Sequence, residues 1–232
     1  MNDLKRIGGW SAILFGIAVV VAFGLFIPTF SAMPADAMQI ENSAGRLAVV
    51  GGMTSAQRAG LALGFAFETL AGILMFPALL ALHAEAKNES EARSTLALGM
   101  AALGIPFFML SHFSGFSLVQ MSNGFGSAGE VVQAARAAAY GYAERLSTVY
   151  EPVFWLFFAW SAVLWLGLMS SGLFPRWLAW VGLAAALLGV IGTVGGVVVP
   201  VLEFLSPMAL LVLVVWFIGL GVWLLRSGRG AG

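Results

Sequence analysis

The sequence contains no cysteine in 232 residues. The chain therefore forms no disulfide and no thiolate metal site, and cysteine usage gives no information about its redox compartment. Histidine is scarce as well, since His83 and His112 are the only two. Any imidazole chemistry must use one of these two positions.

Charged residues are also scarce in the sequence. Charged residues make up 9% of the chain, and eleven basic residues balance eleven acidic ones to give a formal net charge of zero. They are scattered, so the chain has neither the basic patch of a nucleic-acid-binding protein nor an acidic tail. Nucleic acid is not expected as a partner.

Apolar residues dominate what remains. They make up 60% of the sequence, and the mean hydropathy is +0.96, outside the range of soluble domains. A helix needs roughly 20 apolar residues to cross a bilayer, and six stretches meet this requirement: residues 9–27, 60–82, 95–119, 149–170, 177–199 and 204–225. We predict an all-α, polytopic transmembrane bundle of six helices that forms a single integral membrane domain over residues 1–232.

Basic residues predict the orientation of this bundle, because Lys and Arg are enriched in cytoplasmic loops. With a cytoplasmic N-terminus, most of them fall inside: Lys5, Arg6, Lys87, Arg93, Arg176, Arg226 and Arg229. We therefore expect both termini to be cytoplasmic, in a multi-pass protein of the bacterial inner membrane. The lipid bilayer is its expected surrounding.

The first span raises an alternative. Lys5, Arg6, an apolar run and "ADA" at residues 35–37 resemble the three parts of a secretory signal peptide. The apolar run has about 18 residues, longer than the usual 7–15. We expect it to remain as a span; cleavage would leave five spans and an outside N-terminus.

Two outer segments are longer than simple connectors, residues 29–58 and 121–147. The second contains "AGEVVQAARAAAYGYAERL", which is helical by propensity. It either extends the fourth span outward or forms an interfacial helix or lid. We expect the extension.

Glu68 and His112 are the ionisable residues deepest in the spans, and an intramembrane ionisable residue is by default a candidate functional site. Glu68 lies about ten residues, roughly 15 Å, from the outer end of its span, and His112 lies roughly 12 Å below Gln120. The two are therefore expected at similar depth on consecutive helices. The helical face of Glu68 is mostly small or apolar, so it should point into the bundle: Leu61, Gly64, Ala71, Gly72 and Met75.

Two interpretations of this pair stay open. Glu68 and His112 could fasten two helices, as a hydrogen-bonded pair or with each residue satisfied by a serine or the backbone. Alternatively they form, with Ser111 and Ser114, a protonatable site in an outward-opening polar pocket. The candidate entrance residues are Gln120, Tyr150 and Glu151.

Other features are explained without a ligand. Glu151 precedes Pro152 at the expected start of the fourth span, where an acidic residue suits the helix N-terminus, and Glu203 has the same explanation before the sixth span. The glycine-rich "GVIGTVGG" at residues 189–196 is expected to allow close helix packing, with Gly192 and Gly196 four residues apart.

Cofactor and catalytic sets are not found. A bis-histidine haem needs two histidines at one depth, whereas His83 is expected at the inner boundary. One His and one Glu fall short of the three protein ligands of a catalytic zinc site, and no hydrolase or phosphate-binding motif is present. We expect no cofactor and no metal.

Three stretches resemble a known family. They are "LKRIGGWSAILFGI" at residues 4–17, "SGLFPRWLAWVGL" at 171–183 and "FIGLGVWLLRSG" at 217–228. Their order and spacing resemble the bacterial six-span domain-of-unknown-function 4386 family, which implies a six-helix integral membrane fold and no particular reaction. Members often carry an acidic residue shortly before the closing "GxWL", where this chain has Phe217. If that acid matters to the family's activity, the resemblance implies that this chain has lost it.

Three functional classes follow, in order of preference. The first is a non-enzymatic membrane protein that binds or moves a small solute, ion or lipid through the outward-facing pocket. The second is a structural or regulatory membrane subunit, in which Glu68 and His112 are buried against neighbours. A membrane enzyme comes last, because too few polar residues lie at one depth to form a catalytic set.

Overall fold

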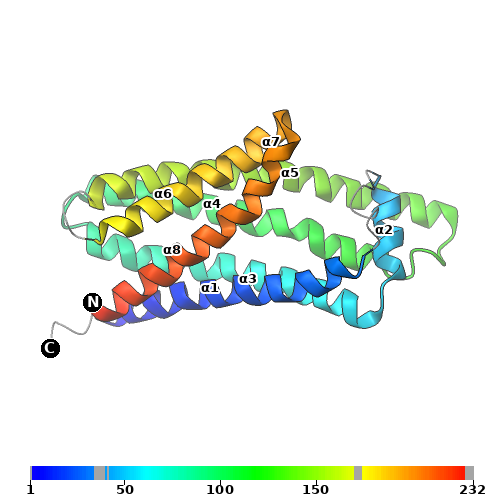
Figure 1. Ribbon diagram of the computed structural model, residues 1–232, viewed down its shortest axis with the longest axis horizontal. Helices are drawn as coiled ribbons and strands as arrows, with labels where there is room; N and C mark the ends of the chain where they lie inside the picture. The colour runs from blue at the N-terminus through cyan, green and yellow to red at the C-terminus, as the bar shows by residue number, and fades with distance from the viewer. Residues whose placement is uncertain (1, 34–39, 41, 170–173, 228–232) are drawn as a thin grey trace. The chain divides into compact units, whose positions relative to one another are not determined.

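Every regular element in the described part of the chain is helical (Figure 1). The structure is a computed structural model, and it describes residues 2–33, 40, 42–169 and 174–227. Within them, six helical segments are long and apolar enough to cross a membrane: Asp3–Ser31, Ser55–Ala86, Glu91–Ser122, Glu130–Leu168, Arg176–Val198 and Pro200–Ser227. The predicted all-α, six-span fold is confirmed.

The first four spans are single α-helices; the first three extend beyond both predicted ends, and the fourth begins well before its predicted start. They are α1 (Asn2–Ser31), α3 (Ser55–Ala86), α4 (Glu91–Ser122) and α5 (Glu130–Met169). At about 1.5 Å per residue each exceeds the roughly 30 Å hydrocarbon core. Helix α5, with 40 residues, contains the Ala-rich outer segment, so the expected outward extension of the fourth span is confirmed.

The last two spans contain irregular helical turns. The fifth is α6 (Arg176–Val190), the π-helical η2 (Ile191–Gly195) and α7 (Gly196–Val198), and the sixth is the 3₁₀-helical η3 (Pro200–Phe204) and α8 (Leu205–Ser227). A Cβ on Gly192 would lie 2.5 Å from the backbone nitrogen of Ser206, and one on Gly196 would lie 2.6 Å from Cγ of Glu203. The expected packing role of the glycine-rich stretch is confirmed.

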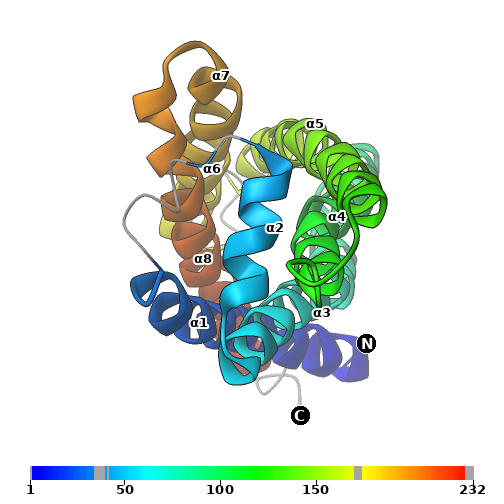
Figure 2. The same ribbon diagram turned by 90° about the vertical axis from the view of Figure 1, so that its right-hand side faces the viewer.

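A short helix, α2 (Ser43–Gly52), lies in the first long outer segment and was not predicted (Figure 2). It begins at an N-cap, where the side chain of Asn42 accepts a hydrogen bond of 2.7 Å from the backbone N–H of Gly45. At its other end, Nη1 of Arg58 donates to the carbonyls of Gly51 and Met53, at 3.0 and 2.7 Å. Both ends therefore have partners for backbone groups that a helix leaves unsatisfied.

The chain divides into two compact units. Unit 1 comprises Met1–Ala18, Leu70–Phe108 and Glu151–Gly232, and unit 2 comprises Val19–Thr69 and Met109–Tyr150. Helices α6 and α8 contact each other within unit 1. The core of this unit is rich in aromatic side chains, including Phe15 and Phe217, whose ring centroids are 4.1 Å apart.

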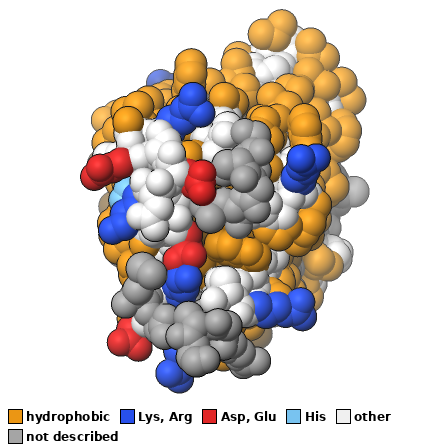
Figure 3. Space-filling view, turned by 90° about the vertical axis from the view of Figure 1, so that its left-hand side faces the viewer, with side chains coloured by type: hydrophobic (Ala, Val, Ile, Leu, Met, Phe, Trp, Pro, Cys, Tyr) orange, Lys and Arg blue, Asp and Glu red, His pale blue; other side chains and the backbone are white. Residues whose placement is uncertain are grey.

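Charged side chains gather at the end of unit 1 where α1 begins and α8 ends (Figure 3). One ion pair there joins the start of α1 to the end of α3, with 2.8 Å between Nζ of Lys5 and Oε2 of Glu85. This is the end for which the sequence predicts a cytoplasmic location. The orientation itself stays a prediction.

Two clusters of buried residues in the described part of unit 2 include residues of α2. Ala22, Phe26, Val50 and Leu61 form the first, and Leu47, Phe125 and Tyr140 form the second. Helix α2 supplies a buried residue to each, Val50 and Leu47 respectively. This burial holds α2 against the parts of α1, α3 and α5 that belong to unit 2.

Candidate functional site

Glu68 of α3 and His112 of α4 face each other within unit 2. Nε2 of His112 lies 3.3 Å from Oε2 of Glu68, an ion pair when the imidazole is protonated. The His112 side chain is 18% exposed and that of Glu68 is 7% exposed. The structure thus brings together the two residues that the sequence placed at similar depth, while their function stays a prediction.

Glycines let aromatic rings fill the space around this pair. A Cβ on Gly64, one helical turn before Glu68, would lie 2.3 Å from the ring of Phe26. On α4, a Cβ on Gly115 would lie 2.2 Å from the ring of Phe65, and the two phenylalanine rings are 4.9 Å apart. The small face that carries Glu68 therefore points inward, as predicted.

The two candidate serines lie beside His112. Oγ of Ser111 is 3.2 Å from Nδ1 of His112, so the ring has a hydroxyl on one nitrogen and the Glu68 carboxylate on the other. The hydroxyl of Ser114 receives a hydrogen bond of 3.0 Å from Ser147 of α5 and donates one of 3.3 Å to the carbonyl of Ser111. Both serines thus belong to one polar neighbourhood with the pair.

Four further residues, not assigned to the site from sequence, extend this neighbourhood toward α2. Arg46 forms an ion pair with Glu144, and the hydroxyl of Tyr140 donates to the same carboxylate at 3.2 Å. The backbone carbonyl of Glu144, 3.2 Å from Oγ of Ser147, is an alternative acceptor for the hydroxyl proton that Ser147 can donate to Ser114. We call the whole set the polar row: Glu68, His112, Ser111, Ser114, Ser147, Glu144, Tyr140 and Arg46.

Part of the row had a sequence signal. Tyr140, Glu144 and Ser147 follow one another at spacings of four and three, which places them on one face of a helix. Their partner Arg46 lies on α2, a helix of ten residues that is too short for a hydropathy search aimed at spans of roughly 20 residues. The sequence therefore indicated the members of the row on α5 but not Arg46 on α2.

A cavity of about 260 Å³ lies at the α2 end of the polar row. Arg46 and Tyr140 belong both to the row and to the lining of this cavity, which we call the α2 cavity. Neither Glu68 nor His112 lines it. The complete lining is Phe30, Met33, Arg46, Val49, Val50, Leu118 and Tyr140.

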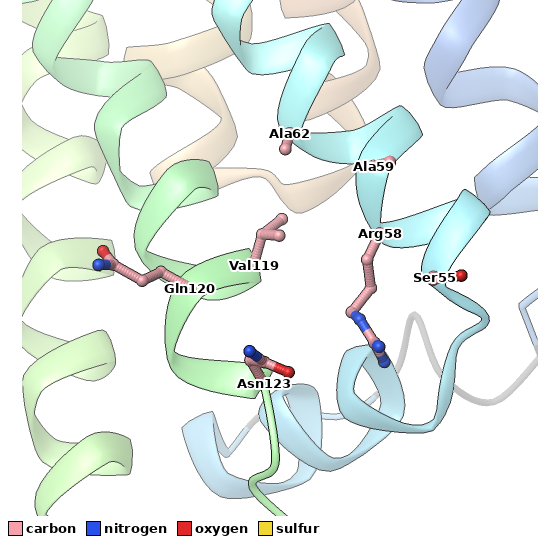
Figure 4. A pocket seen from close by; sticks show the side chains of 7 residues that line it. All are labelled: Ser55, Arg58, Ala59, Ala62, Val119, Gln120 and Asn123. Carbon is pink, nitrogen blue, oxygen red and sulfur yellow. The ribbon is translucent and has the colours of Figure 1, made fainter.

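A second cavity, of about 370 Å³, contains one of the candidate entrance residues (Figure 4). We call it the Arg58 cavity; its lining is Ser55, Arg58, Ala59, Ala62, Val119, Gln120 and Asn123. Gln120 is exposed, and its side chain points away from Arg58. Tyr150 is half-buried on α5 and lines neither cavity. The entrance role of Gln120 and Tyr150 stays a prediction.

Glu151 has a different position from the one expected. Because α5 begins at Glu130, Glu151 lies in the middle of a continuous helix, and the prediction that it occupies a helix start is wrong. Its carboxylate accepts a hydrogen bond from the hydroxyl of Ser206, within unit 1. The helix continues through Pro152, so the proline did not mark the boundary that the sequence suggested. Its proposed entrance role stays untested.

The other histidine is engaged elsewhere. In unit 1, Nδ1 of His83 lies 2.7 Å from Oγ of Ser94. Among the described residues, no three His, Asp or Glu side chains converge as a metal site requires. The arrangement in unit 2 is thus a Glu–His pair with hydroxyl partners, suited to exchanging a proton or binding a polar group.

Comparison with known families agrees with the resemblance in the sequence. The sequence model of a domain of unknown function, DUF4386, matches residues 7–228, nearly the whole chain. The chain belongs to the DUF4386 family. No curated protein and no solved structure matches it.

The DUF4386 resemblance motifs meet inside unit 1, where they pack helices. A Cβ on Gly8 would lie 2.2 Å from Cβ of Ala81 of α3, so this glycine allows α1 to approach α3. At the contact between α1 and α8, a Cβ on Gly221 of α8 would lie 2.6 Å from the carbonyl oxygen of Gly9 of α1. The paired glycines of the first motif therefore let α1 touch two helices at once.

The other DUF4386 motifs join through aromatic rings. Phe174, at the turn into α6, packs on Trp223 of α8 with ring centroids 4.4 Å apart, and a Cβ on Gly219 would lie 2.3 Å from the ring of Trp177. Phe217, shortly before the closing "GxWL", is fully buried against Phe15. In this DUF4386 protein that position is a packing residue.

Proposed function

We propose that this DUF4386 protein binds or moves a small solute, ion or lipid through the outer part of unit 2, with Glu68 and His112 as its protonatable element. It does so without enzymatic chemistry, as a multi-pass protein of the bacterial inner membrane with both termini cytoplasmic. The observation that carries this proposal is the 3.3 Å Glu68–His112 contact, extended by the polar row to the α2 cavity.

The cost of polar groups in a membrane supports the proposal. Ionisable side chains are expensive in the apolar core of a bundle and are mostly retained for function. A contact that only fastens two helices needs no further polar groups. Here hydroxyl groups continue from Ser111, which contacts His112, through Ser114 and Ser147 toward a second ion pair. Such a row gives water molecules partners along its length.

One observation favours the alternative, a structural or regulatory subunit. Neither the α2 cavity nor the Arg58 cavity has Glu68 or His112 in its lining. In that case the pair joins α3 to α4 and exchanges no proton with the outside. The two functions differ in whether the imidazole of His112 responds to external pH.

Nitrogen NMR of the imidazole distinguishes them, because the chain has only two histidines. In the His83→Asn variant, His112 gives the sole imidazole signal. We expect its ring nitrogen shifts to change reversibly when the buffer pH is changed, because the proposal requires protons to pass between the buffer and the ring. Shifts that stay constant would assign the pair to the structural alternative.

A neighbouring variant controls for general perturbation. Thr69 follows Glu68, but its hydroxyl donates to the carbonyl of Phe65 on its own helix at 2.9 Å. Thr69→Val should leave the NMR response unchanged, whereas Glu68→Gln should alter it. In proteoliposomes containing a pH-sensitive dye, a proton flux elicited by Na⁺, K⁺ or an amino acid should be lost in Glu68→Gln and kept in Thr69→Val. Flux retained in Glu68→Gln would contradict the proposal.

A further inference from the structure

The Arg58 cavity combines one positive charge with an apolar floor. The polar residues of its lining are Arg58, Ser55, Asn123 and Gln120, whose side chain points away from Arg58, and the rest is Ala59, Ala62 and Val119. No acidic residue contributes to the lining. A cavity with this composition is complementary to a molecule that has an anionic end and an apolar end.

Among the described residues, Arg58 is held in place by backbone carbonyls and not by an acidic partner. Its Nη1 atom donates to the carbonyls of Gly51 and Met53 at the end of α2, and in the described part of the chain no carboxylate lies within ion-pair distance of it. Arg46, by contrast, is paired with Glu144. A guanidinium presents a planar fork of donors that fits phosphate and carboxylate oxygens. In Arg58 neither Nε nor Nη2 is used by a described hydrogen bond.

The position of this cavity suits a lipid headgroup. Arg58 precedes the predicted start of the second span by two residues, and it is ten residues, roughly 15 Å, outward of Glu68 along the helix. Figure 4 shows Arg58 and Asn123 on facing sides of the opening, with Val119 between α4 and α3. Polar groups therefore lie at the expected membrane boundary, with small apolar side chains next to them.

We propose that the Arg58 cavity binds the oxyanion headgroup of an amphiphile, a phosphate or carboxylate. Arg58 and Asn123 contact the oxyanion, and Ala59, Ala62 and Val119 contact the adjoining carbon atoms. This site is separate from the Glu68–His112 pair and does not depend on its function. The same oxyanion could come from a membrane phospholipid or from free phosphate, and the test separates these sources.

The test uses the full chain in nanodiscs of phosphatidylcholine, titrated with phosphatidylglycerol or with inorganic phosphate. Bound lipid is counted by native mass spectrometry after release from the disc. We expect phosphatidylglycerol to bind in preference to phosphatidylcholine, and the Arg58→Gln variant to bind it about tenfold more weakly, the loss of one charge-assisted hydrogen bond. If inorganic phosphate competes for the cavity and phosphatidylglycerol is not preferred over phosphatidylcholine, the ligand is free phosphate and not a lipid headgroup.

Two further variants keep the result interpretable. Arg136→Gln removes a comparable arginine, whose Nη1 donates to the carbonyls of Met121 and Asn123 but which does not line the cavity. It should retain binding. Ala59→Phe fills the cavity while leaving Arg58 in place, and it should lose binding. Equal losses in Arg136→Gln and Arg58→Gln, full binding in Ala59→Phe, or no binding of either probe would overturn the proposal.

Discussion

Replacing His112 by leucine is expected to lower the free energy of unfolding of the solubilised protein by about 2–3 kcal/mol. The substitution leaves the buried carboxylate of Glu68 without its imidazole partner. Breaking a buried ion pair costs about 3–5 kcal/mol in soluble proteins, while hydrogen bonds within membranes average about 0.6 kcal/mol. The expected value lies between them because both side chains are mostly buried.

A double-mutant cycle shows whether the loss comes from the pair. Glu68→Leu should also destabilise the protein, and the double variant should lose less than the sum of the two single losses, by about 0.6–2 kcal/mol. Denaturant unfolding in detergent, followed by tryptophan fluorescence, provides the measurement, with Thr69→Val as the neutral control. Strict additivity of the two substitutions would show that Glu68 and His112 do not interact in solution.

The second large effect is expected at the crossing of α1 and α8. A β-carbon on Gly221 would meet the carbonyl oxygen of Gly9 at 2.6 Å and the nitrogen of Ile13 at 3.1 Å. Because these are backbone atoms, the helices must move apart to accept it. Gly221→Ala should therefore lower the free energy of unfolding by about 1–3 kcal/mol, as overpacking does.

Gly99 of α4 offers a matched control within the same unit. A β-carbon there would meet nothing within 4 Å, so Gly99→Ala should leave stability unchanged or raise it by up to about 1 kcal/mol through helix propensity. Both variants are compared by the same denaturant unfolding. Equal effects at the two positions would contradict the packing role assigned to the DUF4386 glycine motif.

The sequence predicted the fold well because a membrane imposes a simple rule on it. Each span needs roughly 20 apolar residues, which hydropathy detects directly. Helix α2 escaped because it has ten residues and is held by burial of Leu47 and Val50 rather than by a membrane. Two signals were needed for α5: hydropathy placed its apolar span from residue 149, while the helix propensity of the Ala-rich segment predicted the extension that begins at Glu130.

The candidate site was predicted in part. Glu68 and His112 could be placed at one depth because helical rise converts residue counts into distance. The continuation of the polar row through Ser147 and Glu144 to Arg46 could not be predicted. It depends on how α5 and α2 are rotated against α4, which the sequence does not show. Glu151 illustrates the opposite error: with the helix boundary misplaced, a mid-helix residue looked like one at a helix start.

Accessibility of an introduced thiol tests the central claim, that water reaches the Glu68–His112 pair along the polar row. The chain has no cysteine, so one substitution reports one position. Ser114 lies in the row, while Ser117, three residues further along α4, is 6% exposed and bonded to the carbonyl of Phe113. A membrane-impermeant maleimide added from outside should label Ser114→Cys rapidly and Ser117→Cys hardly at all. Equally slow labelling of both cysteines would mean that water does not enter the polar row and would contradict the claim that it reaches the Glu68–His112 pair.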